Sequence, residues 1–191
     1  RIGNFTAAFC ELDHHLLVQP HIHGGTIFRV ARIVQLLGQL LASGSSDGTV
    51  RVWDGVQVEL RKVLDGHAGA VRGVGVSADG ETVVSGGFDG TVRLWLTRSG
   101  RRLATLPAHV GGVRGVALSA DGRTAASGGF DGTVPLWSAD TGLQLTTLQG
   151  HTAGVRGVAL SADGTTVASS GPDATIRVWD AHNGERRATL E

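Results

Sequence analysis

The hydrophobic positions of this chain fall in short runs that are separated by turn signals. Residues 71–76 form a run rich in valine and glycine and are followed by Ser-Ala-Asp-Gly at 77–80. Because an Asp-Gly pair supplies the positive-φ positions of a tight hairpin, we expect two antiparallel strands to meet there. The turn signals that follow place the remaining strands of this unit at 82–85, 91–95 and 101–106. Four short strands of this kind make one small antiparallel sheet.

The same pattern recurs along the chain with a period of 42 residues. Four residue types share this spacing: Trp53, Trp95, Trp137 and Trp179; Ser43, Ser85, Ser127 and Ser169; Asp47, Asp89, Asp131 and Asp173; and His67, His109 and His151. We therefore expect a non-repeat segment at 1–23, a degenerate copy at 24–66, and further copies at 67–108, 109–150 and 151–191.

Glycine is unusually frequent, with 30 of 191 residues. A small sheet rich in glycine cannot bury both of its faces alone, but stacking copies around an axis buries them, as in a β-propeller. The first copy departs from this pattern between residues 24 and 40, where a degenerate strand pair, a short amphipathic helix and sequence outside the repeat all stay open.

The run from His67 to Ser85-Gly-Gly-Phe-Asp89-Gly-Thr-Val-Arg-Leu-Trp95 resembles a WD repeat of the β-propeller family. The resemblance covers about residues 40–191. It implies an all-β propeller of WD-repeat type with about four four-stranded antiparallel blades. Such rings usually close with about seven blades, within the range of 4–8 known for propellers. We therefore expect a partial ring or a segment of a larger propeller, or a half-ring that associates with a second copy.

Histidine, serine and aspartate are also the components of a hydrolase triad, but a catalytic triad occurs once, beside a cleft, whereas this set recurs. The resemblance implies a structural row instead, in which aspartate accepts from histidine, and serine meets both histidine and the indole N–H. The expected rows are His67–Ser85–Asp89–Trp95, His109–Ser127–Asp131–Trp137 and His151–Ser169–Asp173–Trp179. A hydrolase or metal-dependent enzyme that uses these residues is the alternative.

In the family, positions three and five beyond the histidine and loops on one face of the disc meet the partner. Carried to this chain, these positions are Ala70, Gly112 and Gly154, then Arg72, Arg114 and Arg156, with Phe88 and Phe130 before the turn aspartates. We expect the arginines to form an arc of positive charge that Phe88 and Phe130 flank. Such an arc suits an acidic peptide, a phosphate or a nucleic-acid backbone; a solvated rim inherited by duplication stays open.

Three further arginines, Arg51, Arg93 and Arg177, precede the tryptophans, and we expect them to cover the indole or to pair with an acid of a neighbouring blade. In the third copy this position is Pro135, which lacks the ladder donor and is expected to loosen the blade. In the fourth copy Ala174 replaces the turn glycine and is expected to be strained.

The composition of the chain limits the classes of partner and site that we expect. Seventeen basic residues balance seventeen acidic ones, so nucleic acid is not the expected partner, and no stretch is long and apolar enough for a membrane span. Residues 1–23 contain side chains of the types that bind zinc, but their spacing fits no standard zinc finger, and we interpret these side chains as surface groups: Cys10, Asp13, His14, His15, His21 and His23. The chain opens with Arg1, so a processed product or an excerpt is expected.

The expected function is a non-enzymatic, cytoplasmic interaction scaffold without cofactor or metal. Its partner would be a peptide or protein of unknown identity, bound on the loop face, and the chain could serve as the sensing or docking part of a larger signalling protein.

Overall fold

In the computed structural model, which describes residues 31–37, 40–57 and 59–191, every regular element is a β-strand. The first sheet consists of β1 (Ala31–Leu37), β2 (Leu40–Ser45), β3 (Val50–Asp54) and β4 (Leu60–Leu64). The second consists of β5 (Val71–Val76), β6 (Thr82–Gly87), β7 (Thr91–Leu96) and β8 (Arg102–Pro107). The third consists of β9 (Val113–Leu118), β10 (Thr124–Gly129), β11 (Val134–Ser138) and β12 (Gln144–Leu148), and the fourth of β13 (Gly157–Leu160), β14 (Thr166–Ser170), β15 (Ile176–Asp180) and β16 (Arg186–Leu190).

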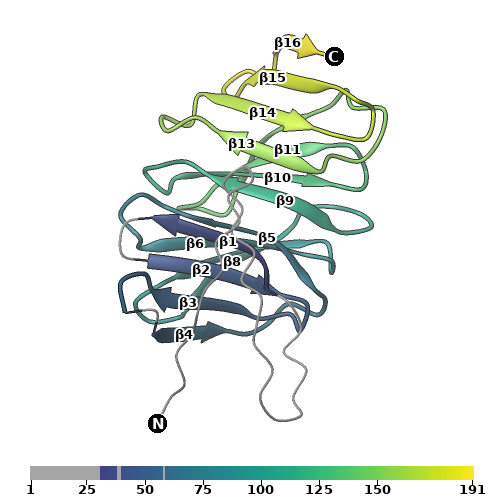
Figure 1. The fold of residues 1–191 in the computed structure, drawn as a ribbon. Helices are drawn as coiled ribbons and strands as arrows, with labels where there is room; N and C mark the ends of the chain where they lie inside the picture. Colours follow the sequence, from purple (N-terminus) through teal and green to yellow (C-terminus); the bar gives the residue numbers. More distant parts are fainter. Residues whose placement is uncertain (1–30, 38–39, 58) are drawn as a thin grey trace.

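Each sheet is antiparallel, and its strands lie side by side in chain order. The four sheets follow one another as an open stack rather than a closed ring, with β16 at the upper end of the view in Figure 1. This confirms the predicted blades of a propeller and the predicted partial ring. The segment that the sequence left open between strand and helix contains the strand β1, which pairs with β2.

The core lies between the sheets. Val50, Val52 and Leu64 of the first sheet pack against Val74 and Trp95 of the second, and two equivalent clusters join the second to the third sheet and the third to the fourth. Each buried tryptophan therefore lies between its own sheet and the preceding one. Burial of apolar surface between neighbours, rather than within one sheet, holds the stack together.

Candidate interaction surface

The second and fourth sheets each contain a row of hydrogen-bonded side chains that joins the loop before the first strand to the third strand. In the second sheet, His67 Nε2 lies 2.9 Å from Ser85 Oγ, and His67 Nδ1 lies 3.1 Å from Asp89 Oδ1. Trp95 Nε1 donates to Ser85 Oγ at 2.8 Å. The Asp89 carboxylate can only accept, so the ring proton is assigned to His67 Nδ1, and Nε2 of the neutral ring accepts from the Ser85 hydroxyl.

The same contacts recur in the fourth sheet, where His151 Nδ1 lies 2.8 Å from Asp173 Oδ2 and Trp179 Nε1 donates to Ser169 Oγ at 2.8 Å. His151 Nε2 also lies 2.8 Å from this hydroxyl. In the first sheet only the last link is described, from Trp53 Nε1 to Ser43 Oγ at 2.9 Å. The sequence has no histidine at the equivalent place, Gly25, which lies outside the described residues.

Burial and hydrogen bonding fix the charges of this row. Burial lowers the pKa of His67, although Asp89 opposes the shift, so the imidazole is neutral near pH 7. Burial disfavours the charged form of Asp89, but hydrogen bonds from Ala68, Thr91 and His67 outweigh this cost and lower the pKa of Asp89 to about 2. The row thus consists of an ionised carboxylate, a neutral imidazole and two neutral donors.

The row has the connectivity of a Ser-His-Asp triad, but its serine cannot act as a nucleophile. Ser85 and Ser127 are fully buried, and Ser169 is nearly so. In the second and fourth sheets the hydroxyl also accepts the indole N–H. A substrate carbonyl could not approach such an oxygen, whereas a nucleophile must face a substrate cleft. The buried position supports a structural role for the row over catalysis.

The third repeat departs from its siblings at Pro135. His109 still contacts Asp131 at 2.9 Å and Ser127 at 2.9 Å, but Trp137 Nε1 is buried without a hydrogen-bond partner. The ladder between β10 and β11 also ends at Ala126↔Leu136, whereas the second and fourth sheets continue with Ser85↔Arg93 and Ser169↔Arg177. Proline has no N–H to donate at the next pair, so the blade is locally loosened, as the sequence predicted.

The arginines that precede the tryptophans pair within their own repeat. Arg51 lies 2.9 Å from Asp47, Arg93 lies 3.6 Å from Asp89, and Arg177 lies 3.8 Å from Asp173. The ion pairs of these arginines in the described residues are thus made within the repeat, although the carboxylate of Asp65 in the preceding copy also attracts Arg93. The turn aspartate stands four residues earlier, on the same face of the chain, and is the nearest carboxylate.

A glycine makes room for two of these arginines. A Cβ at Gly66 would collide with the Arg93 guanidinium, and one at Gly150 would collide with that of Arg177. The third repeat has changed both members of the pair, because Ala108 stands where the glycine would be and Pro135 where the arginine would be. The methyl group of Ala108 and an arginine at 135 would compete for the same space.

This pairing predicts coupled substitutions. Pro135→Arg restores a ladder donor and a partner for Asp131, but its guanidinium fits only when Ala108→Gly removes the competing methyl group. We expect the change in the free energy of unfolding of the double variant, relative to the parent, to exceed the sum of the changes in the two single variants by about 1 kcal/mol. Urea unfolding of the parent, both single variants and the double variant measures this coupling, and additive effects would contradict it.

Two of the three predicted partner-binding arginines lie against phenylalanine rings. The Arg72 guanidinium carbon is 5.7 Å from the centre of the Phe88 ring, and that of Arg114 is 3.9 Å from the centre of the Phe130 ring. The two rings meet edge to face, with centroids 5.9 Å apart. We call Arg72, Phe88, Phe130 and Arg114 the arginine–phenylalanine surface. Phe88 and Phe130 are 50% and 41% exposed, so the surface is open to a ligand.

Arg156, the third predicted arginine, is exposed and stands beside the fourth sheet, where Pro172 replaces phenylalanine. The structure therefore stacks two of the three arginines on aromatic rings and leaves the third free of one. In the described residues, Arg72, Arg114 and Arg156 form no ion pair with a carboxylate, unlike Arg51, Arg93 and Arg177. Three positive charges at equivalent places thus have no counter-ion among the residues that the structure describes.

The other predicted partner-binding residues contact the aromatic turns. The Ala70 carbonyl accepts from Phe88 N at 2.8 Å, and the Gly112 carbonyl accepts from Phe130 N at 3.2 Å. A Cβ at Gly112 would lie 3.0 Å from the Phe88 carbonyl oxygen, and one at Gly154 would lie 3.1 Å from Phe130 Cα. These three residues position the rings of the arginine–phenylalanine surface, which gives their small size a structural cause.

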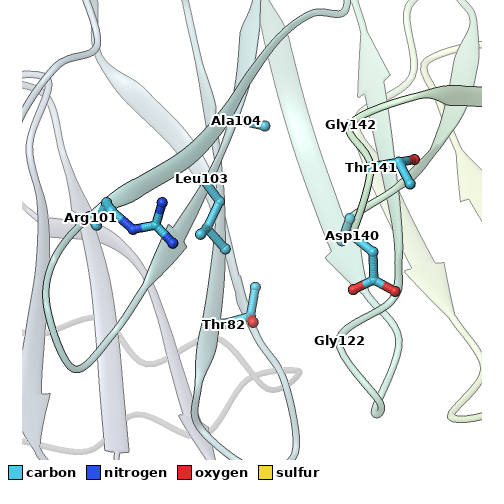
Figure 2. A pocket seen from close by; sticks show the side chains of 9 residues that line it. Thr82, Arg101, Leu103, Ala104, Gly122, Asp140, Thr141 and Gly142 are labelled. Carbon is cyan, nitrogen blue, oxygen red and sulfur yellow. The ribbon is translucent and has the colours of Figure 1, made fainter.

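A groove of about 430 Å³ lies between the second and third sheets, at the ends of the strands that are opposite to this surface. Arg101, Leu103 and Thr82 stand on one side, and Asp140, Thr141 and Gly142 on the other (Figure 2). None of the residues predicted to bind a partner lines it.

Metal sites and membrane-spanning helices are absent from the part of the chain that the structure describes. Among residues 31–37, 40–57 and 59–191, no group of three or more His, Cys, Asp or Glu side chains could hold a metal ion. The histidines and Cys10 of the first 23 residues lie outside the described part. The same part of the chain has no helix that is long and apolar enough to cross a membrane.

Comparison with known proteins agrees with the geometry. The family described as "WD domain, G-beta repeat" matches residues 19–54, 58–95, 100–138 and 142–180, which is most of the chain. The nuclear distribution protein PAC1 of Mycosarcoma maydis is 40% identical over 47 residues, which is 25% of this chain and 10% of that protein. The chain thus spans about a tenth of the length of this relative.

The chain belongs to the WD40-repeat family. Proteins built from these repeats are generally non-enzymatic scaffolds that bind proteins or peptides.

Sequence reasoning missed the threonines that follow each turn. Thr91 Oγ1 donates to Asp89 Oδ1 at 2.8 Å, and Thr133 and Thr175 make the same bond to Asp131 and Asp173. The signal was present, because these threonines share the 42-residue period, and a hydroxyl two residues after an aspartate is suited to bonding its carboxylate.

Proposed function

We propose that this chain is a scaffold that binds an acidic peptide segment of a partner protein on the arginine–phenylalanine surface, together with Arg156. The observation that carries the proposal is the set of three arginines at equivalent places without a carboxylate partner in the described residues. A cytoplasmic location and a docking role within a larger signalling protein belong to the same proposal.

The stacked geometry suits carboxylates. A guanidinium that lies over an aromatic face keeps its N–H groups at the periphery, where they can donate two parallel hydrogen bonds to one carboxylate. The ring also restricts the arginine side chain before binding, which lowers the entropy lost in the complex. The exposed edges of Phe88 and Phe130 add apolar area between the two charges.

The test is a triple variant with a matched control. A fluorescent peptide of alternating Glu and Leu serves as the probe, because it offers both carboxylates and apolar contacts. We expect Arg72→Ala, Arg114→Ala and Arg156→Ala together to weaken binding at least about tenfold, since each lost charged pair has an effect of that order. The control removes three exposed arginines that lie elsewhere and have no ion pair in the described residues: Arg101, Arg102 and Arg186.

The control loses the same charge as the test variant but keeps the arginine–phenylalanine surface and Arg156, so it should bind like the parent. Equal weakening in both triple variants would reduce the effect to net charge and refute the surface. Binding of a single-stranded oligonucleotide in preference to the peptide, with a steep dependence on salt, would instead favour the nucleic-acid alternative. Ester or phosphoester hydrolysis that is lost in Ser85→Ala would favour the enzyme alternative.

A further inference from the structure

The groove between the second and third sheets contains a leucine at a place where two other sheets carry a paired arginine. In the fourth sheet, Arg187 lies 2.6 Å from Asp180 and donates to Thr166 Oγ1 at 3.0 Å. In the first sheet, Arg61 forms the same ion pair with Asp54. The arginine thus links the last two strands of its sheet, and in the fourth sheet it also reaches the threonine that begins the second strand.

The second sheet has replaced both members of this pair with leucine. Leu96 stands where the aspartate would be, and Leu103 stands where the arginine would be. Leu103 is the extra residue of a bulge in β8 and lines the groove, where it is 40% exposed. Thr82, the counterpart of Thr166, lines the groove as well, and its hydroxyl has no hydrogen bond in the described residues. The groove therefore offers an apolar surface and a hydroxyl group to a ligand.

Charges of opposite sign flank this apolar surface. The side chain of Arg101 has no ion pair in the described residues, and Figure 2 shows it on the side of the groove opposite to Asp140. Asp140 lies 3.9 Å from Arg123, but this ion pair is weak because its side chains are 67% and 73% exposed. Both charges are therefore available to a ligand that enters the groove.

We propose that this groove binds an extended peptide segment of a partner protein in which an apolar residue stands between an acidic and a basic residue. The apolar side chain packs on Leu103 and Ala104, which Figure 2 shows between Arg101 and the turn that carries Asp140. The acidic side chain pairs with Arg101, the basic one pairs with Asp140, and the Thr82 hydroxyl bonds the peptide backbone. The volume of the groove, about 430 Å³, is in the range of sites for small ligands.

The two flanking charges make the groove selective. A segment with two acidic residues brings one of them beside Asp140, and a segment with two basic residues brings one beside Arg101, so each meets a like charge at one end. The groove thus selects a segment that carries both signs. This proposal is independent of the arginine–phenylalanine surface, which lies at the opposite ends of the strands. The peptide of alternating Glu and Leu that tests that surface has no basic residue, and Asp140 disfavours it in the groove.

The test compares capped, dye-labelled peptides with the centres Glu-Leu-Lys, Glu-Leu-Glu, Lys-Leu-Lys and Gln-Leu-Gln by fluorescence polarisation. The whole chain carries Arg72→Ala, Arg114→Ala and Arg156→Ala, so that acidic peptides report on the groove alone. We expect Glu-Leu-Lys to bind at least about threefold more tightly than the other three, since an exposed charge pair has an effect of that order. Arg101→Glu should transfer the preference to Lys-Leu-Lys, and Asp140→Arg should transfer it to Glu-Leu-Glu. Equal binding of all four peptides, or a preference that neither variant changes, would overturn the proposal.

A second variant closes the groove with an arrangement that the chain already uses. Leu96→Asp with Leu103→Arg builds into the second sheet the ion pair of the first and fourth sheets, and should weaken binding of Glu-Leu-Lys at least about tenfold. Ser138→Asp with Leu145→Arg makes the same exchange in the third sheet, where neither residue lines the groove, and should leave binding unchanged. Equal binding by the two double variants would refute the site. A chain that binds none of the four peptides, whether its groove is empty or filled by another part of the chain or by a second copy, would refute it as well.

Discussion

Replacement of Trp95 by alanine is expected to lower the free energy of unfolding by about 3–5 kcal/mol. Trp95 is buried in the core between the first and second sheets, with Val52 and Val83 among its cluster. Its indole N–H also donates to the buried hydroxyl of Ser85. The alanine variant therefore leaves both a cavity and a serine that has lost one of its partners. Urea unfolding followed by circular dichroism measures the change, and an unaltered midpoint would refute the account of the buried row.

A comparison of two phenylalanine variants isolates the hydrogen bond from the volume. Trp95→Phe removes an N–H that is bonded to Ser85, whereas Trp137→Phe removes an N–H that has no partner. The two changes are otherwise alike, because both tryptophans lie buried at equivalent places. The first should cost about 1 kcal/mol more than the second. Equal losses would mean that the indole bond adds nothing to stability.

Gly86→Ala is expected to lower the free energy of unfolding by about 1–3 kcal/mol, because it overpacks the joint between the second and third sheets. The new Cβ would lie 2.5 Å from Val113 Cγ1 and 2.7 Å from Val116 Cγ1. Both valines are anchored on β9, so relief requires the third sheet to move as a unit. Thermal unfolding monitored by calorimetry measures the loss.

Val113→Ala provides the internal check on this steric explanation. It removes the Val113 methyl group that lies nearest the new Cβ but leaves the contact with Val116, so its cost and that of Gly86→Ala should not add. The double variant should be more stable than the sum of the two single effects predicts. Strict additivity would place the cost of Gly86→Ala in the strand itself rather than in the joint.

The repeated strands could be anticipated from the sequence, because one period recurs for four residue types. The His–Ser–Asp–Trp row was implied by the resemblance to WD repeats, and its link to the indole is missing at Trp137. The pairing of Arg93 could have been foreseen as well. Asp89 precedes it by two steps on one face of the chain, and the side-chain alternation of a strand brings the two together. The expectation named the indole or an acid across the blade boundary; Asp65 of the preceding copy does attract the Arg93 guanidinium, but the ion pair is made to Asp89 within the repeat.

Other features depend on distances that a sequence does not encode. Residues 31–37 read Ala-Arg-Ile-Val-Gln-Leu-Leu, with apolar residues adjacent rather than alternating, so only the pairing with β2 distinguishes strand from helix. The stacking of Arg114 on Phe130 depends on rotamers and on how closely β9 passes the following turn. The sequence likewise gives no sign that the N–H of Trp137 is buried without a partner, because Ser127 stands at the same place as Ser85 and Ser169.

The contact between Phe88 and Phe130 joins side chains from two different sheets. A ligand that contacts both rings at once therefore spans the boundary between adjacent blades and restricts their motion relative to each other. Binding would then stiffen the stack, so that a force applied at one end is passed to the other with less bending when the surface is occupied.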